Sequence, residues 1–195
     1  GYNDGDLHPR DNLTRAQAAK LMVDIFENEN IVSKNQTVVL SGVTLEDTIY
    51  TNRISVGEKV GDGDTLIDNC VILGTLNIEG GGNGDGGSGV RIRDSRVSSA
   101  EIHRNSGSVL VQAEGETTVV RSEASDEAFL REKNLDSSGD FGQGFVSVSA
   151  GRAAYTSLAG DFDRVEISAP KVDLMIEEGT VNQLTADSYA TKTNI

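Results

Sequence analysis

The sequence predicts a mainly β protein: a single-stranded parallel β-helix, expected to be right-handed, preceded by a short α-helical N-terminal segment. Apolar residues alternate with polar ones in very short pieces, such as Ile54–Val56 and Val90–Ile92. That period of two is typical of strands with one or two inward side chains. The pieces that begin at Val165, Val172 and Val181 follow at steps of 7 and 9 residues. This is the spacing of short strands joined by bends, in coils of about 20–25 residues.

An antiparallel sandwich is the other all-β architecture that short strands could build. It prefers longer strands joined by hairpin turns, and the only Asn-Gly dipeptide, Asn83-Gly84, lies inside a glycine tract. The β-helix is therefore preferred for residues 31–195. Its strands are expected at the apolar pieces Ile54–Val56, Val71–Leu73, Leu76–Ile78, Val90–Ile92, Val109–Val111, Val146–Val148, Val165–Ile167 and Val172–Leu174.

Residues 1–30 are predicted to form a separate unit, a turn followed by a helix. Asp4-Gly5 suits a turn, and Pro9 prevents a helix from running through it. Thr14 and Gln17 have the spacing of a capping box. The residues that follow place one apolar stripe at helical spacing, made of Ala18, Leu21, Met22, Ile25 and Phe26.

One segment of the β region has the composition of a helix. Ser125–Lys133 contains helix-forming residues and a start resembling a capping box. The pieces Thr118–Val120 and Phe145–Val148 on either side both fit coils of the β-helix. A strand is therefore favoured for this segment, with a short inserted helix as the alternative.

Composition excludes several classes of function. The 195 residues hold 31 Asp and Glu against 17 Lys and Arg, a net charge of −14, which repels nucleic acid and anionic membrane surfaces. No apolar run reaches the roughly 18–20 residues of a membrane-spanning helix. The single cysteine, Cys70, cannot support a disulfide framework and is expected to be a small buried side chain. Because the first residue is Gly1, we expect a mature or excised fragment.

The N-terminal residues carry a family resemblance. Gly1-Tyr2-x-Asp4-Gly5-x-x-x-Pro9 followed by Leu13–Ala19 resembles the second half of an S-layer homology (SLH) repeat, with its pattern G-Y-x-D-G-x-F-R-P and I-T-R-A-E-x-A. Gln17 replaces the motif Glu, Leu7 the Phe and His8 the Arg.

In the SLH family, three repeats form a bundle that holds a surface protein to the pyruvylated secondary polymer of a Gram-positive-type cell wall. The resemblance would give the role of gripping the anionic sugar to Arg15, with Asp4 and Gly5 shaping the adjacent turn. The alternative, which we favour, is that this half-repeat is a junction between an anchor and the next domain.

Most of residues 37–195 also resemble, more loosely, the β-helical modules that follow SLH repeats in Gram-positive surface proteins. Residues 38–45 and 160–170 carry this likeness. Together the two resemblances imply a secreted protein at the cell wall or cell surface. Its implied partners are the secondary cell-wall polysaccharide, through a complete SLH anchor, and neighbouring surface-layer subunits; no nucleic-acid partner and no membrane insertion are expected.

No cofactor is expected, and calcium is the alternative considered. The glycine tract, residues 80–89, contains Gly81–Asp85, which matches a calcium β-roll motif except that its Asp comes one place early. A protruding loop is the favoured interpretation. Gly61–Asp64 could hold a hard cation but is better explained as a bend. With only His8 and His103 present, no histidine-based metal site is expected.

No catalytic residue is assigned from the sequence. Paired carboxylates occur at Asp62/Asp64, Asp161/Asp163 and Glu177/Glu178, but such pairs are common in so acidic a chain. β-helical polysaccharide lyases and hydrolases stack sugars on aromatic platforms, whereas this chain has no Trp and four scattered Tyr.

One basic cluster stands out on the acidic background. Arg91, Arg93 and Arg96 surround a predicted strand and could form a cationic ridge that contacts an anionic glycan or a neighbouring subunit. Pairing of these arginines with acids on adjacent coils is the alternative, each exposed pair contributing at most about 1 kcal/mol.

The sequence thus predicts a non-enzymatic surface module, a β-helical spacer or building block adjoining an SLH anchor. A wall-tethered polysaccharide lyase or hydrolase and a glycan-binding adhesin are the alternatives.

Overall fold

The computed structural model describes residues 30–82, 88–135, 139–148, 154–191 and 193–195. The chain divides into two compact units, Gly1–Asn30 and Ile31–Ile195. The predicted N-terminal helix lies outside the described residues, as do Asp4, Gly5 and Arg15, so these expectations stay predictions.

The described residues are mainly strand. A single short 3-10 helix, η1, spans Glu58–Val60 within them. The strands are β1 (Asn30–Val32), β2 (Gln36–Val38), β3 (Val43–Glu46), β4 (Thr48–Tyr50), β5 (Ile54–Val56), β6 (Thr65–Asp68), β7 (Val71–Ile78), β8 (Val90–Arg93), β9 (Arg96–Ile102), β10 (Val109–Gly115), β11 (Thr118–Ala124), β12 (Ala128–Leu135), β13 (Asp140–Val148), β14 (Ala154–Ile167) and β15 (Val172–Ala186).

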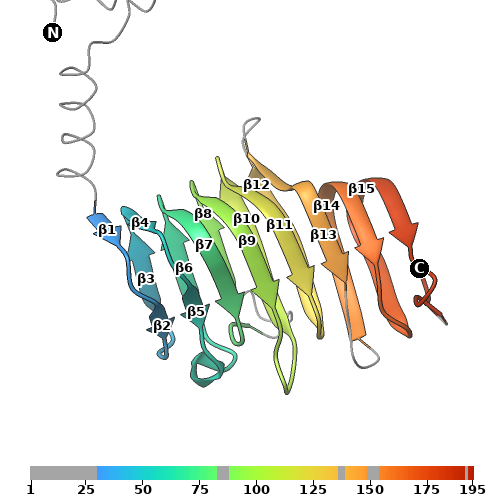
Figure 1. Ribbon diagram of the computed structural model, residues 1–195, viewed down its shortest axis with the longest axis horizontal. Helices are drawn as coiled ribbons and strands as arrows, with labels where there is room; N and C mark the ends of the chain where they lie inside the picture. The colour runs from blue at the N-terminus through green and yellow to red at the C-terminus, as the bar shows by residue number, and fades with distance from the viewer. Residues whose placement is uncertain (1–29, 83–87, 136–138, 149–153, 192) are drawn as a thin grey trace, which may run out of the picture. The chain divides into compact units, whose positions relative to one another are not determined.

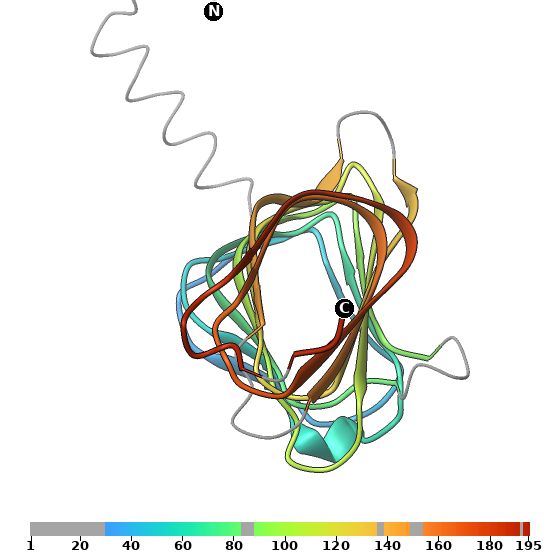
Figure 2. The same ribbon diagram turned by 90° about the vertical axis from the view of Figure 1, so that its right-hand side faces the viewer.

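These strands wind into a parallel β-solenoid of about six turns, which confirms the predicted parallel β-helix (Figure 1). Every strand pairing recorded among the described residues is parallel. Each pairing joins one coil to the next, so residues close in space are about one coil apart in sequence. In Figure 2 the coils of this unit lie over one another.

Each complete coil has three faces. The first face consists of β3, β6, β8, β10, β12 and the first parts of β14 and β15. The second begins with β1 and β4 and continues through the first parts of β7, β9, β11 and β13. The third consists of β2, β5 and the last parts of β7, β9, β11, β13, β14 and β15.

The core consists of columns of inward residues that are register partners. On the first face one column runs Val43, Thr65, Val90, Val111, Leu130, Leu158, Ile176. Its five central members are 0% exposed, whereas Val43 is only partly buried and Ile176 is 40% exposed. In this column, full burial is limited to the members that have a coil on both sides.

Coil length varies along this column. Register partners are 18 residues apart between Leu158 and Ile176, and 28 apart between Leu130 and Leu158. The paired segments of this face keep their register except for shifts at Ala113/Gly115 and Leu158/Ala159. Insertions are tolerated at bends since they leave the columns intact.

The strand pieces expected from the sequence lie in strands, but one has the opposite register. Val71–Leu73 was expected to point Val71 and Leu73 inward; in β7 it is Ile72 that is 0% exposed, while Leu73 is 57% exposed. The β7–β9 register shifts between Ile72 and Thr75, where the strand passes from the second face to the third. At Gly74, a Cβ would collide with the Asn52 carbonyl, so a side chain there would disturb this bend.

The segment with helical composition forms a strand, as favoured. β12 covers Ala128–Leu135, and Ala128 and Leu130 are fully buried. Pairing with β10 and β14 on either side overrides the local helix propensity.

In the glycine tract, Gly80, Gly81 and Gly82 are buried, and residues 83–87 lie outside the described residues.

Two leucines of β7 provide a matched test of this register. Leu76 is 0% exposed and Leu73 is 57% exposed. We expect Leu76→Ala to lower the free energy of unfolding by about 2–5 kcal/mol, because it leaves a cavity in the core. Leu73→Ala should change it by about 0.5 kcal/mol or less. Urea denaturation followed by circular dichroism measures both, and equal losses would contradict the register.

Candidate functional site

The predicted arginine ridge is divided between two faces. Arg91 and Arg93 point outward on the first face, in β8, and both are partly buried. Arg96 is exposed at the start of β9, beyond the corner that leads to the second face.

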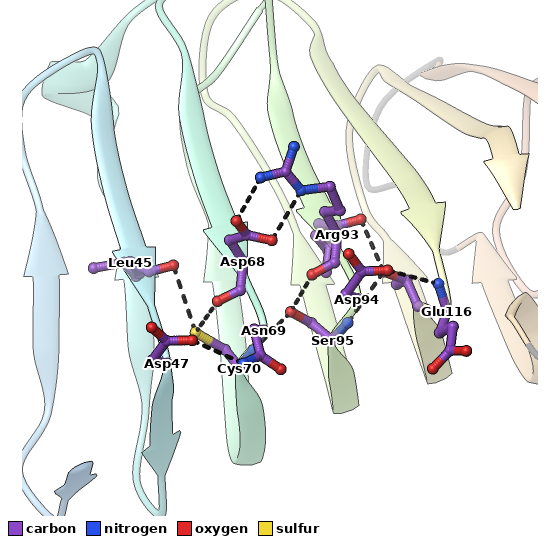
Figure 3. Close-up of polar contacts among 11 residues, drawn as sticks. Leu45, Asp47, Asp68, Asn69, Cys70, Arg93, Asp94, Ser95 and Glu116 are labelled. Atoms are coloured by element: carbon purple, nitrogen blue, oxygen red, sulfur yellow. Dashed lines mark hydrogen bonds and ion pairs between the residues drawn. The ribbon is translucent and has the colours of Figure 1, made fainter.

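Arg93 makes a cross-coil ion pair. Such pairing was the alternative to a ridge that contacts a glycan or a neighbouring subunit. Its Nε lies 2.9 Å from Asp68 Oδ1, and its Nη2 also bonds Asp68 Oδ2, a two-pronged contact (Figure 3). Asp68 is its register partner on the preceding coil. This guanidinium holds the pKa of the Asp68 carboxyl below its ordinary value, mainly through the side-chain hydrogen bond. Arg93 is therefore already engaged within the solenoid.

The strands of the first face end at a corner built from polar residues in left-handed backbone conformation. Asp47, Asn69 and Asp94 each have φ of 48°, a value that Asn and Asp tolerate better than most other non-glycine residues. They follow strand ends that are register partners, from Glu46 to Asp68 to Arg93. Asn69 Nδ2 donates to Asp47 Oδ1 at 2.7 Å, so neighbouring corners bond to each other (Figure 3).

A column of small polar side chains follows this corner on the inside. It consists of Thr48, Cys70, Ser95 and Thr117, all buried. The Cys70 amide donates to Ser95 Oγ at 2.9 Å, and the Ser95 amide donates to Thr117 Oγ1 at 3.3 Å. Ser95 Oγ in turn donates to the Arg93 carbonyl at 2.6 Å. These contacts satisfy backbone groups that the bend removes from the sheet, which a buried corner requires.

Cys70 belongs to this corner, as the prediction of a small buried side chain implies. Its Sγ lies 3.2 Å from the Asp68 carbonyl and 3.5 Å from the Leu45 carbonyl, both hydrogen-bond acceptors (Figure 3). Burial raises the pKa of the Cys70 thiol. A protonated, buried thiol is a poor nucleophile, so its role at the corner is packing and hydrogen bonding.

A second group of cross-coil contacts lies in the connections between the third face and the first. Arg104 Nη1 pairs with Asp62 Oδ1 at 2.8 Å and also donates to the Ser108 carbonyl at 2.9 Å. The Asp64 carboxylate accepts from the Gly89 amide at 3.0 Å. Both carboxylates of the Gly61–Asp64 segment are thus used within the fold, as expected for a bend.

The other carboxylate pairs also make cross-coil contacts. Asp161 Oδ1 accepts from the amide and the hydroxyl of Thr180, and Asp163 Oδ1 accepts from Asn182 Nδ2 at 2.9 Å. Glu177 Oε1 accepts from Ser157 Oγ at 2.6 Å.

Within the part of the chain that the structure describes, no three His, Cys, Asp or Glu side chains are grouped so as to hold a metal ion. The segment considered as an alternative calcium motif includes Asp85, which lies outside the described residues. His103 is partly buried, with Nε2 at 3.4 Å from Glu79 Oε1.

The structure reveals one outward cluster that the sequence did not suggest. On the first face the rings of Phe129 and Tyr155 lie 5.7 Å apart between centroids, tilted by 56°. The Arg131 guanidinium carbon lies 5.9 Å from the Phe129 ring centroid, and its Nη2 lies 3.7 Å from Glu177 Oε2. Aromatic rings beside an arginine and a carboxylate offer both a stacking surface and polar contacts.

This cluster could not be found from spacing alone. Phe129 and Tyr155 are 26 residues apart, across the connection with the largest step in the first-face column. Only the register of Ala128 with Thr156 brings the two rings together. The only local indication of this cluster in the sequence is that Phe129 and Arg131 stand two places apart in one strand, so that both point to the same face.

The Asp68–Arg93 pair makes stability depend on pH. Because the pKa of Asp68 is lowered by folding, the pair stabilises the protein above the ordinary pKa of 3.8, and this contribution is lost as the pH falls through the lowered value. We expect Asp68→Asn to reduce the free energy of unfolding at pH 7 by about 0.2–1 kcal/mol, a small loss because both side chains are partly exposed to solvent.

Denaturation of wild type and Asp68→Asn across this pH range tests the pair. The difference should vanish in acid and should be absent when both proteins also carry Arg93→Gln. A difference that persists in the Arg93→Gln background would assign the effect to another partner.

No protein-family model matches the chain, and no curated protein and no solved structure matches it at a significant level. The functional interpretation therefore depends on the chain's own residues.

Proposed function

We propose that this chain is a non-enzymatic structural module of a bacterial cell surface, a β-helical spacer or building block that adjoins an SLH cell-wall anchor. It is proposed to act as a right-handed, single-stranded β-helix that holds what it carries at a fixed distance from the wall. The observation that carries this proposal is the unbroken run of inward columns through the described coils.

A stack of this kind suits a spacer for a mechanical reason. The strands of each coil pair only with strands of adjacent coils in the described residues and share a core with them, so length can be added without changing the cross-section. The column from Val43 to Ile176 keeps its central members fully buried despite coils of different length.

The outward polar groups also support a structural role. The carboxylates of Asp62, Asp64, Asp161, Asp163 and Glu177 each bond a group on another coil. A lyase or hydrolase would need acids free to exchange protons with a substrate. These carboxylates instead join coils, which favours the spacer over the enzyme.

The location at the cell surface is supported by the SLH-like motif of residues 1–19 and by the acidic composition. A net charge of −14 favours solubility of an extended exported protein. Among the residues that the structure describes, no helix has the length and apolarity needed to traverse a lipid bilayer.

Sedimentation with purified pyruvylated cell wall tests the proposal. We expect the 195-residue chain alone to remain in the supernatant, and the same chain fused behind a complete SLH anchor to pellet with the wall. Neither protein should release reducing ends or unsaturated products from wall polysaccharides or uronates. Turnover that is lost in Asp161→Asn would overturn the non-enzymatic function.

The same assay decides the role of the half-repeat. If the chain alone pellets with the wall and Arg15→Ala abolishes this, residues 1–30 bind polymer and are not a junction. Arg53→Ala, which removes a base from an exposed position of the solenoid, is the matched control.

A glycan-binding adhesin is the second candidate, and the Phe129–Tyr155–Arg131 cluster is the observation that favours it. If the solenoid binds soluble acidic polysaccharide, Tyr155→Ala should weaken binding at least tenfold, or about 1.4 kcal/mol. Tyr189→Ala, at a side chain 73% exposed and in a different part of the chain, should leave binding unchanged. Equal binding by both variants would contradict this candidate.

A further inference from the structure

The first face carries a pair of bases that differs from the predicted arginine ridge. Arg93 is engaged in its ion pair, and Arg96 lies beyond the corner. Arg91 instead shares its outward column with Arg131, because the strand register aligns Arg91 with Gln112 and Gln112 with Arg131. This column crosses three neighbouring strands, β8, β10 and β12, in the middle of the face.

The Arg131 guanidinium makes few of the hydrogen bonds open to it. Its Nε is buried and has no hydrogen-bond partner in the part of the chain that the structure describes. Its Nη2 lies 3.7 Å from Glu177 Oε2, which is beyond hydrogen-bond distance. Polar groups in such surroundings are normally hydrogen-bonded, so Arg131 retains donors for a further acceptor.

Arg91 is the second base of the column. It points outward and is partly buried, and among the described residues its side chain makes no hydrogen bond or ion pair. Gln112, between the two arginines, is uncharged, and its Nε2 donates to Glu114 Oε1. The column therefore presents two cationic groups separated by a neutral one.

The separation of the two bases determines the spacing of charges that a ligand needs. Two steps between neighbouring strands place the backbones of Arg91 and Arg131 about 10 Å apart along the stack. One disaccharide of an extended glycan has a similar length. A glycan with a carboxylate on every second sugar therefore brings successive carboxylates to the two guanidinium groups.

The aromatic cluster lies at the Arg131 end of this column. Phe129 stands two places before Arg131 in β12, and the Tyr155 ring packs against the Phe129 ring. Aromatic rings stack on the apolar C–H faces of pyranose sugars, whereas the side chains of an acidic peptide have no such face. The cluster and the column together fit a saccharide better than an acidic peptide.

We propose that the first face binds a glycan with a carboxylate on every second sugar, which crosses the strands from Arg131 to Arg91. Each arginine binds one carboxylate through charge-assisted hydrogen bonds, and a sugar ring stacks on the Phe129–Tyr155 pair. The net charge of −14 repels polyanions that lack contacts at this spacing, which favours selectivity. This inference rests on the glycan-binding candidate function and specifies its ligand.

Hyaluronan oligosaccharides, in which glucuronate alternates with N-acetylglucosamine, are the probe. The same oligosaccharides with their carboxyl groups reduced to alcohols are the matched neutral ligand. Isothermal titration calorimetry with the full chain measures the dissociation constants. Wild type should bind the acidic form at least about tenfold more tightly than the reduced form. Arg91→Gln and Arg131→Gln should each raise the dissociation constant for the acidic form at least about tenfold.

Arg96→Gln is the matched control. It removes one base of the predicted ridge that lies outside this column, so it should leave the dissociation constant unchanged. Circular dichroism melting curves check that each variant is folded. If Arg131→Gln does not fold, Arg91→Gln decides the question alone, because the proposed contact needs both bases.

Absence of hyaluronan binding would overturn the proposal, and so would equal affinity for the acidic and reduced forms. Equal weakening by Arg96→Gln and Arg91→Gln would also overturn it. Polyglutamate bound as tightly as hyaluronan would assign the column to an acidic peptide and contradict the glycan.

Binding that requires Tyr155 but neither arginine of the column would overturn the two-base contact while leaving glycan binding in place. The spacer function is decided separately by sedimentation with cell wall, so the failure of one proposal is distinguishable from the failure of the other.

Discussion

Stacking of parallel coils in register is the constraint on which the rest of this structure depends. A coil of this solenoid has few inward side chains, and those of the first-face column are fully buried only where coils lie both above and below them. Ile92 and Val111 are fully buried inside the stack, whereas Ile176 in the last coil is 40% exposed. The same contrast explains why the unit's ends, and not its sides, are the places where apolar core residues meet solvent.

Register also determines which polar groups meet. A side chain at the end of one strand lies beside its register partner on the next coil, so Arg93 can bond Asp68 although 25 residues separate them. The corner repeats a left-handed conformation at Asp47, Asn69 and Asp94, and the buried hydroxyls behind it take over backbone hydrogen bonds that the sheet gives up. Outward acids and bases thus become contacts between coils, which is consistent with a structural role.

The sequence predicted the type of fold because that signal is local. Short alternating pieces such as Ile54–Val56 show strand character within three residues, and their close spacing favours coils over hairpins. The register of Val71–Leu73 was wrong because three apolar residues in a row do not show which of them point inward; the bend at Gly74 decides it. The segment Ser125–Lys133 shows that neighbouring strands can outweigh helix propensity.

The surface clusters could not be predicted, because they depend on coil length. Steps of 18 to 28 residues along one column give no fixed period from which a cross-coil neighbour could be computed. For this reason the sequence predicted that Arg93 could pair with an acid on an adjacent coil, but not that this acid is Asp68. It also gave no indication that Phe129 and Tyr155 lie side by side. The roles suggested for Asp4, Gly5 and Arg15 remain predictions, because those residues lie outside the described part of the chain.

Distances between coils test the central claim most directly. Ser55, Glu123 and Glu166 point outward in one column of the third face, three and five coil steps apart counted from Ser55. In a Cys70→Ser background, spin labels at Ser55/Glu123 and Ser55/Glu166 should lie about 14 Å and about 24 Å apart, since neighbouring strands are about 4.8 Å apart. Pulsed electron paramagnetic resonance should give two narrow distributions in that proportion. Broad distributions, or distances that do not increase with the number of coil steps, would contradict the stacked solenoid.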